Sequence, residues 1–260
     1  MIASQPLDLL PIWGVYIFTV GVLLLSLEGG YRLGNFSQQR WPDRSESGVG
    51  TMVGASLAFL GFLLAFITGI AVNIFNGRLQ LVIKEANAIS TTYLRAGYLE
   101  EPYSIESRQL LREYVDMRLA AVDRNRREAA IARSEEIHQE LWSLAEIVAK
   151  NSPTPTTSIY ISALNEVIDL HTERINMELG IRVPPTILLG VYLVAMLTML
   201  LIGVHGSYSG KRNYLALVTM VLILSMVFLV IVDLDRSQQG LLRVSQKALI
   251  DLQRQIHLGP

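Results

Sequence analysis

The sequence contains no cysteine and few charged residues. Without cysteine the chain can form neither a disulfide nor a thiolate metal site. Charged residues make up 17% of its 260 positions and hydrophobic residues 51%, with a mean hydropathy of +0.37. That balance is too apolar for an ordinary soluble domain and too polar for a chain wholly embedded in lipid. It predicts a membrane part joined to a water-facing part.

The motifs of several function classes are also missing. A net charge of −1 provides no basic surface for nucleic acid. The sequence has no glycine-rich phosphate loop, nucleophile elbow, paired-carboxylate motif or HExxH pattern. His171 lies on an apolar helical face where Ile168 and Ile175 occupy the positions that a second ligand would need. We therefore expect no enzyme, no metal and no cofactor, and we interpret His171 as a core or interface residue.

One uncharged stretch organises the chain. No charged residue occurs between Glu46 and Arg78, and about 20 apolar residues suffice to cross a hydrocarbon core about 30 Å thick. Small residues on this stretch recur every three or four positions, which predicts close approach by another helix: Gly50, Gly54, Ala58, Gly61, Ala65 and Gly69. A second stripe forms a bulky ridge that ends in an amide: Ala58, Phe62, Phe66, Ile70 and Asn73. We predict that this is the functional helix of a membrane protein.

Three further apolar segments, 11–27, 184–204 and 214–232, have the length of membrane spans. The first lacks the positive region and cleavage site of a signal peptide and is predicted to be a transmembrane helix. Polar connections at 28–47, with a Trp41-Pro42 turn signal, and at 205–213 separate the spans of each pair. The pattern predicts an all-α membrane protein with four transmembrane helices in two hairpins, oligomeric around a central axis. A helical extramembrane domain is inserted between the second and third spans.

The region from 79 to 182 shows helical periodicity and no strand-like alternation of useful length. Helix breaks are predicted at Glu101-Pro102 and at 151–155. The basic cluster at 123–128 fits either a bend or a solvated helical face, and we favour the face. Residues 161–175 form a nearly heptad seam, and 241–258 predict an amphipathic helix. The expected parts are a first transmembrane hairpin (1–77), a helical domain (78–183), a second hairpin (184–235) and a C-terminal tail (236–260).

The charges near the spans do not decide the orientation in the membrane. The two short loops hold five basic residues, which favours a cytoplasmic side for these loops: Arg32, Arg40, Arg44, Lys211 and Arg212. Basic residues also flank the spans on the side of the helical domain, including Arg78, Arg182 and Arg236. Whether the helical domain is cytoplasmic or external stays open.

Four blocks of sequence resemble the bacterial bestrophin-like membrane proteins of the DUF4239 type. They are FLLAF at 62–66, EANAISTTYLRA at 85–96, ALNEVIDLHTERI at 163–175 and DLDRSQQGLLRVSQKAL at 233–249. FLLAF followed by Val72-Asn73 is also similar to the bestrophin second-helix motif. The acidic calcium-clasp run of animal bestrophins is missing after the last span.

Bestrophins are pentameric anion channels whose second helix lines a central pore. The resemblance implies that Phe62 and Phe66 form the neck of such a pore, with Ala58 one turn earlier. It also implies a multi-pass protein of the bacterial inner membrane, with the lipid bilayer, inorganic ions and further copies of the chain as partners. Both termini lie inside in bestrophins, opposite to the count of loop charges.

Several candidate residues have alternative interpretations. Phe62 and Phe66 are either an aromatic constriction or residues that face lipid or the bundle core, while Asn73 lines the pore mouth or simply ends the helix. Glu85 forms either a carboxylate ring or, as we favour, a salt bridge, either between subunits or with a neighbour such as Lys84 or Arg78. Asp233, Asp235 and Arg236 either clamp the tail or form a charged stop at the membrane interface.

Two hypotheses of different class follow. The first is an oligomeric ion channel whose pore is lined by the second transmembrane helix, with anions as the first expectation. The alternative is a non-conducting sensor or scaffold whose helical domain binds a ligand or partner. They differ at Phe62 and Phe66, because only a channel requires these rings for ion flux.

Overall fold

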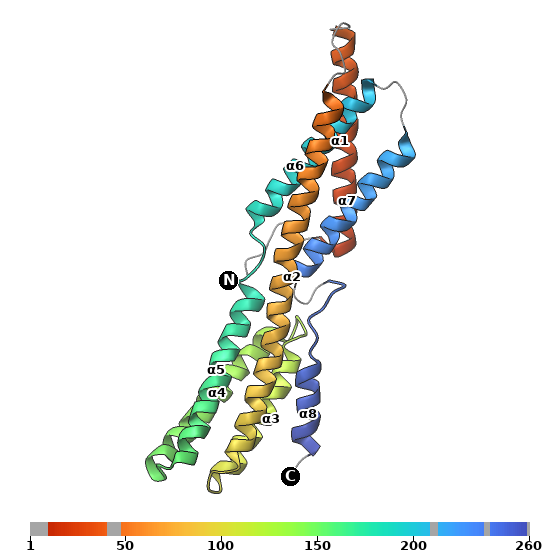
Figure 1. The fold of residues 1–260 in the computed structure, drawn as a ribbon. Helices are drawn as coiled ribbons and strands as arrows, with labels where there is room; N and C mark the ends of the chain where they lie inside the picture. Colours follow the sequence, from red (N-terminus) through yellow and green to blue (C-terminus); the bar gives the residue numbers. More distant parts are fainter. Residues whose placement is uncertain (1–9, 41–47, 209–212, 237–239, 259–260) are drawn as a thin grey trace. The chain divides into compact units, whose positions relative to one another are not determined.

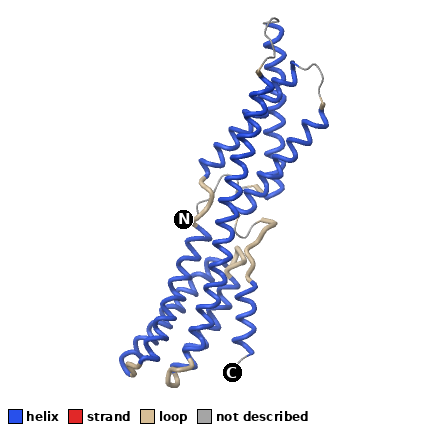
Figure 2. The backbone as a smooth tube through the Cα atoms, in the orientation of Figure 1, coloured by secondary structure: helices blue, strands red, loops and turns tan. Residues whose placement is uncertain are grey.

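A computed structural model describes residues 10–40, 48–208, 213–236 and 240–258. The regular secondary structure of these residues is entirely helical, as predicted (Figures 1 and 2). The Trp41-Pro42 turn signal, Arg44, Lys211 and Arg212 lie outside the described residues. The chain divides into two compact units: unit 1 comprises 1–75 and 182–242, and unit 2 comprises 76–181 and 243–260. The functional domain boundaries expected from the sequence stay a prediction.

Four helices are long and apolar enough to cross a membrane. They are α1 (Ile12–Arg40), α2 (Val49–Ala96), α6 (Pro185–Tyr208) and α7 (Tyr214–Asp235). All four contribute to unit 1, α2 only through its first part. Their buried apolar residues form one core that includes Leu23, Leu60, Val191, Met199 and Phe228. The four predicted spans are thereby confirmed as helices of sufficient length and apolarity.

Helix α1 packs against α6 and α7 in unit 1 (Figure 1). The contact of α1 with α6 depends on small residues spaced four apart, Gly30 and Gly34 on α1 and Gly203 and Ser207 on α6. A Cβ atom at Gly30 would collide with the backbone of Leu200, and one at Gly203 with the backbone of α1. This is the close approach that small residues permit between membrane helices. It involves a different pair of helices from the one that the stripe on 50–69 suggests.

Three helices are longer than the predicted spans. Helix α1 continues through the expected connection to Arg40, and α6 continues to Tyr208. Helix α2 runs without interruption from Val49 to Ala96 and joins what we expected to be a span and a separate helical segment. The physical reason is that hydropathy marks where the apolar side chains end, whereas backbone hydrogen bonding continues until a residue breaks it. An ion pair between Glu28 and Arg32 (2.9 Å) supports the polar end of α1.

Unit 2 is built from the second part of α2 with α3 (Tyr103–Ala120), α4 (Arg127–Asn151), α5 (Pro155–Leu179) and α8 (Lys247–Leu258). Its core includes Ile89, Leu111, Ile137, Leu141 and Leu164. The predicted breaks are confirmed, since α2 ends before Pro102 and α5 begins at Pro155. Thr154 caps α5 by accepting a hydrogen bond from the Thr157 amide (3.2 Å).

One expectation for the helical domain was wrong, and so was the expected start of the tail helix. The cluster at 123–128 is not a continuous helical face, because α3 ends at Ala120 and α4 begins at Arg127. The side chain of Asp123 accepts a hydrogen bond from the Asn125 amide (3.0 Å), a local turn that competes with helix. The amphipathic tail helix begins at Lys247 rather than at Leu241. Residues 240–246 are not helical, and the amides of Leu241 and Leu242 bind the Asp233 carboxylate at the end of α7.

The close crossing of α1 and α6 predicts that a larger side chain lowers stability at the crossing but not elsewhere on α6. Gly203→Leu should destabilise the protein because the new side chain meets the backbone of α1, and overpacking of this kind costs about 1–3 kcal/mol or more. Gly190→Leu on the same helix is the matched control, since a Cβ atom at Gly190 would meet no atom within 4 Å. The measurement is the apparent unfolding temperature of the detergent-purified variants. Equal temperatures for both variants would contradict the assignment.

Candidate functional site

In unit 1, only one side of α2 is covered by the rest of the chain. Leu60, Leu64, Ile67 and Ala71 are buried at alternating spacings of three and four residues, so they lie on one face of the helix. On the other side, Phe62 and Phe66 are 66% and 61% exposed. Their ring centroids lie 6.5 Å apart with nearly parallel planes. The two aromatic rings predicted to constrict a pore therefore lie together on the uncovered face.

The other predicted pore residues divide between the two faces. Ala58 and Asn73 are exposed, in line with the phenylalanines. Ile70 is half-buried and packs against the core of unit 1. The ridge proposed from spacing thus belongs to the uncovered face at four of its five positions, and Ile70 lies at its border.

The small-residue stripe of α2 also lies on the uncovered side. A Cβ atom at Gly54, Gly61 or Gly69 would meet no atom within 4 Å. At Gly50 the nearest atom is Cε1 of His205, at 3.3 Å. In the described part of the chain no helix therefore makes the close approach that the central glycines permit. The stripe from Gly54 to Gly69 therefore has no other helix of the described residues packed on its glycines.

In unit 2 the carboxylate of Glu85 is the centre of a buried polar network. Glu85 is fully buried and accepts hydrogen bonds from Tyr114 Oη (2.6 Å) and Arg118 Nε (2.9 Å) on one oxygen. The other oxygen accepts a hydrogen bond from the Arg174 guanidinium. Two arginines thus pair with one carboxylate in the interior. A carboxylate held in this way presents no charge at the protein surface, and its partners are neither Lys84 nor Arg78, the neighbours considered from sequence.

The network extends to other elements of unit 2. Arg174 also binds Glu178 (2.9 Å) and the side-chain oxygen of Gln246 (2.8 Å), which precedes α8. Tyr114 Oη lies 3.0 Å from Nδ1 of His171. Burial, together with the nearby Glu85 charge, raises the pKa of Tyr114 well above its usual value, so the phenol stays neutral.

The sequence alone did not identify Tyr114, Arg118 and Arg174 as partners of Glu85. A signal was present, because Tyr114 and Arg118 are four residues apart and so share a helical face. Arg174 follows His171 by three residues on α5. Nothing in the linear sequence indicated that these two helices place the groups around one carboxylate of α2.

The acidic residues after the last span hold backbone amides of unit 1. Asp233 accepts hydrogen bonds from the amides of Leu241 (2.8 Å) and Leu242 (2.9 Å). Asp235 accepts from the Val183 amide (2.7 Å) and pairs with Arg182 (2.6 Å). Asp233, Asp235 and Arg236 are all buried. The two carboxylates therefore fasten the ends of chain segments in unit 1.

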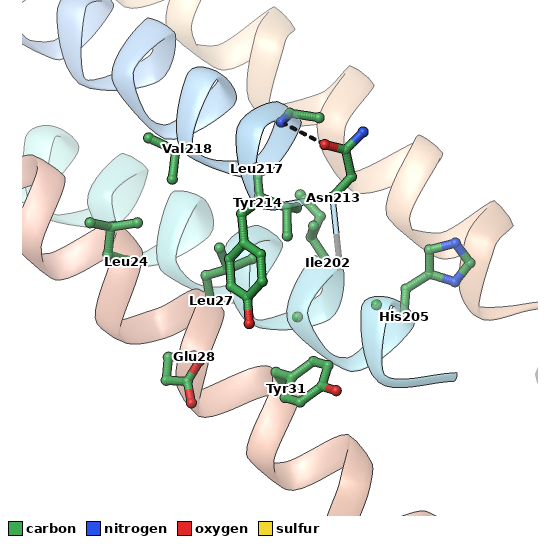
Figure 3. A pocket seen from close by; sticks show the side chains of 13 residues that line it. Leu24, Leu27, Glu28, Tyr31, Ile202, His205, Asn213, Tyr214, Leu217 and Val218 are labelled. Atoms are coloured by element: carbon green, nitrogen blue, oxygen red, sulfur yellow. Dashed lines mark hydrogen bonds between the residues drawn. The ribbon is translucent and has the colours of Figure 1, made fainter. Parts of the chain in front are cut away.

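A cavity of about 400 Å³ in unit 1 lies among α1, α6 and the first turn of α7 (Figure 3). Most of its wall is aliphatic, with Leu24, Leu27 and Leu217 among the lining residues. Polar groups at its rim include Glu28 and Tyr31 of α1 (Figure 3). Asn213 lies at the start of α7, where its side chain caps the helix by accepting from the Ala216 amide (3.2 Å). No residue of α2 lines this cavity, so it is separate from the uncovered face.

Comparison with known proteins agrees with this architecture. Residues 20–249 match the family model of the Bestrophin-like domain. Two crystal structures share the fold at 12% sequence identity. One, of a membrane protein, has a TM-score of 0.63 and covers 91% of this chain and 96% of its own. The other, of a mutant bacterial bestrophin homologue from Klebsiella pneumoniae, has a TM-score of 0.61 and covers 95% and 99%. No curated protein matches the chain.

The buried network predicts a large stability cost for neutralising its centre. Glu85→Gln leaves the guanidinium groups of Arg118 and Arg174 buried without their carboxylate, and breaking a buried pair in this way costs about 3–5 kcal/mol. Glu166→Gln, at an exposed position of α5, is the control and should have little effect. Thermal unfolding in detergent measures both. A Glu85→Gln protein as stable as the control would show that the network does not stabilise unit 2.

Proposed function

This chain belongs to the bestrophin-like family, and from that premise we propose that it forms an ion channel whose pore is lined by α2. Several copies of the chain surround a common axis, and the uncovered face of α2 turns toward that axis. The observation that carries the proposal is the position of Phe62 and Phe66, which are exposed on the membrane helix that bears the family's aromatic motif.

The small-residue stripe supports assembly through the same helix. Gly54, Gly61 and Gly69 have open space where a neighbour can approach, and membrane helices associate where small side chains let their backbones come close. The stripe and the aromatic ridge lie side by side on the uncovered half of α2. A neighbouring subunit that packs on the stripe leaves the rings of Phe62 and Phe66 toward the axis. Five copies is the number that the resemblance to bestrophins implies.

The uncovered face favours anions over cations. The membrane-spanning part of α2 has no charged residue between Glu46 and Arg78, so no ring of carboxylates can attract cations there. Aromatic edges carry partial positive charge, and the Asn73 amide offers N–H donors. A ring of exposed Glu85 carboxylates would favour cations, but Glu85 is buried between two arginines. We place the channel in the bacterial inner membrane as a multi-pass protein.

Ion flux tests the role of the aromatic ridge. The purified protein is reconstituted in liposomes, and its flux is compared under chloride and potassium gradients. We expect chloride flux, which the Phe62→Ala/Phe66→Ala variant changes severalfold while the oligomer persists, because a hydrophobic constriction controls passage through a pore. Phe18→Ala removes an exposed ring of α1 and should leave flux unchanged.

Two outcomes would contradict the channel proposal. If the double variant assembles and its ion flux equals that of the wild type, Phe62 and Phe66 do not line the pore. The absence of any flux from a well-folded oligomer, across several pH values and calcium concentrations, would favour the non-conducting sensor or scaffold instead.

Subunit assembly provides a second test. Gly61→Leu adds bulk where the protomer has open space, so we expect it to dissociate the oligomer without lowering the stability of the protomer. Gly190→Leu, at an equally open glycine of α6, should leave the oligomer intact. Mass measured by light scattering in detergent distinguishes the two. An unchanged oligomer for Gly61→Leu would show that the stripe is not the subunit interface.

A further inference from the structure

Unit 2 contains a cleft between α4 and α5 with two histidines in its wall. The cleft has a volume of about 360 Å³ and belongs entirely to the helical domain. Its lining includes Glu135, His138 and Gln139 from α4, and Ile168, His171 and Ile175 from α5. The sequence pattern predicted no metal site at His171, because no second ligand follows it on its own helix. The second histidine comes instead from the neighbouring helix.

Both histidines present a buried nitrogen that has no partner. His138 and His171 are 7% and 3% exposed, and Nε2 of each is buried without a hydrogen bond. Leaving a polar group unpaired in a protein interior costs about 1–3 kcal/mol, and such groups call for an explanation. Both side chains belong to the wall of the same cleft, and a ligand bound between the two rings would satisfy both nitrogens.

The hydrogen bonds around His171 determine which of its nitrogens carries the proton. The Tyr114 hydroxyl has a single hydrogen and lies 2.6 Å from a Glu85 oxygen, which can only accept it. The hydroxyl oxygen must therefore accept from Nδ1–H of His171, 3.0 Å away. A neutral imidazole carries its single N–H proton on one nitrogen, so the proton at Nδ1 leaves Nε2 unprotonated. His171 thus holds a bare lone pair at Nε2.

This arrangement matches the way proteins prepare a histidine for a metal ion. A ligating imidazole almost always donates its other N–H to an oxygen acceptor, which fixes its tautomer and orientation. Here His171 donates to Tyr114, and Tyr114 donates to Glu85. The two guanidiniums nearby, Arg118 and Arg174, are already paired with Glu85 and Glu178, so their charge is balanced.

The spacing of the rings also suits one shared ion. The ring centroids of His138 and His171 lie 4.7 Å apart, with the planes nearly perpendicular. Two imidazoles on one tetrahedral ion, with metal–nitrogen bonds of about 2.0 Å, place their ring centres about 5 Å apart. Glu135 is exposed, lines the same cleft and precedes His138 by three residues on α4. A Glu-x-x-His pair of this spacing directs both side chains to one side of a helix.

We propose that His138 and His171, joined by the Glu135 carboxylate, bind a divalent transition-metal ion of the zinc class between α4 and α5. Imidazole and carboxylate ligands suit such an ion, and water completes its coordination. In the described residues no three His, Cys, Asp or Glu side chains are already grouped as a site. The proposal therefore requires the exposed Glu135 side chain to turn toward the two histidines when the ion binds.

Cobalt absorption tests the site directly in the full-length protein without an affinity tag. Co²⁺ is titrated into chelator-treated protein in detergent, and the visible band of tetrahedral Co²⁺ is followed. We expect one ion per chain, displaced by Zn²⁺. His138→Gln should weaken binding at least tenfold, and Glu135→Gln should weaken it less.

The controls separate loss of ligands from loss of fold. Glu135 is exposed, so Glu135→Gln keeps the test valid if the buried His138→Gln variant does not fold. His257→Gln removes a histidine of α8 outside the cleft and should leave the titration unchanged. The proposal is overturned if wild-type protein shows no tetrahedral band at millimolar Co²⁺, or if the Glu135 and His138 variants bind as wild type does.

Discussion

Each unit depends on which side of α2 it buries. In unit 1, Leu60, Leu64 and Ile67 turn one side of the helix into the core. In unit 2, Val82, Glu85 and Ile89 are buried from the same helix. Since side chains on a helix keep fixed angular positions, burying these residues determines which others remain outside. Phe62, Phe66 and the central glycines are exposed for that reason.

The two units solve the packing of α2 by different chemistry. In unit 1, the helices pack through apolar side chains and small residues, and α1 crosses α6 closely at Gly30 and Gly203. Helices in lipid gain little from hydrophobic burial against one another, so close backbone approach matters there. In unit 2, a charged network around Glu85 links α2 with α3 and α5. Its cost of desolvation is met by two guanidinium partners and a phenol.

Much of the architecture was predictable because it follows from patterns along single helices. Four apolar segments of sufficient length predicted the four membrane helices, and Pro102 and Pro155 marked helix breaks. The ends of α1, α2 and α6 were predicted too early, because polar side chains do not by themselves stop a helix. A solvated helical face was predicted where the chain forms a turn at 121–126, because basic residues occur both in turns and on solvated helical faces.

The sequence alone determined the all-helical class, the membrane spans and the pairing of a small-residue stripe with an aromatic ridge on α2. These are local properties, carried by hydropathy and by periodicity within one segment. Only the tertiary structure decided that the stripe has no partner within the described part of the protomer, that Glu85 is enclosed by Arg118 and Arg174, and that His138 meets His171. Each of these contacts joins residues distant in sequence, and such pairings depend on how whole helices pack, which no single helical pattern specifies.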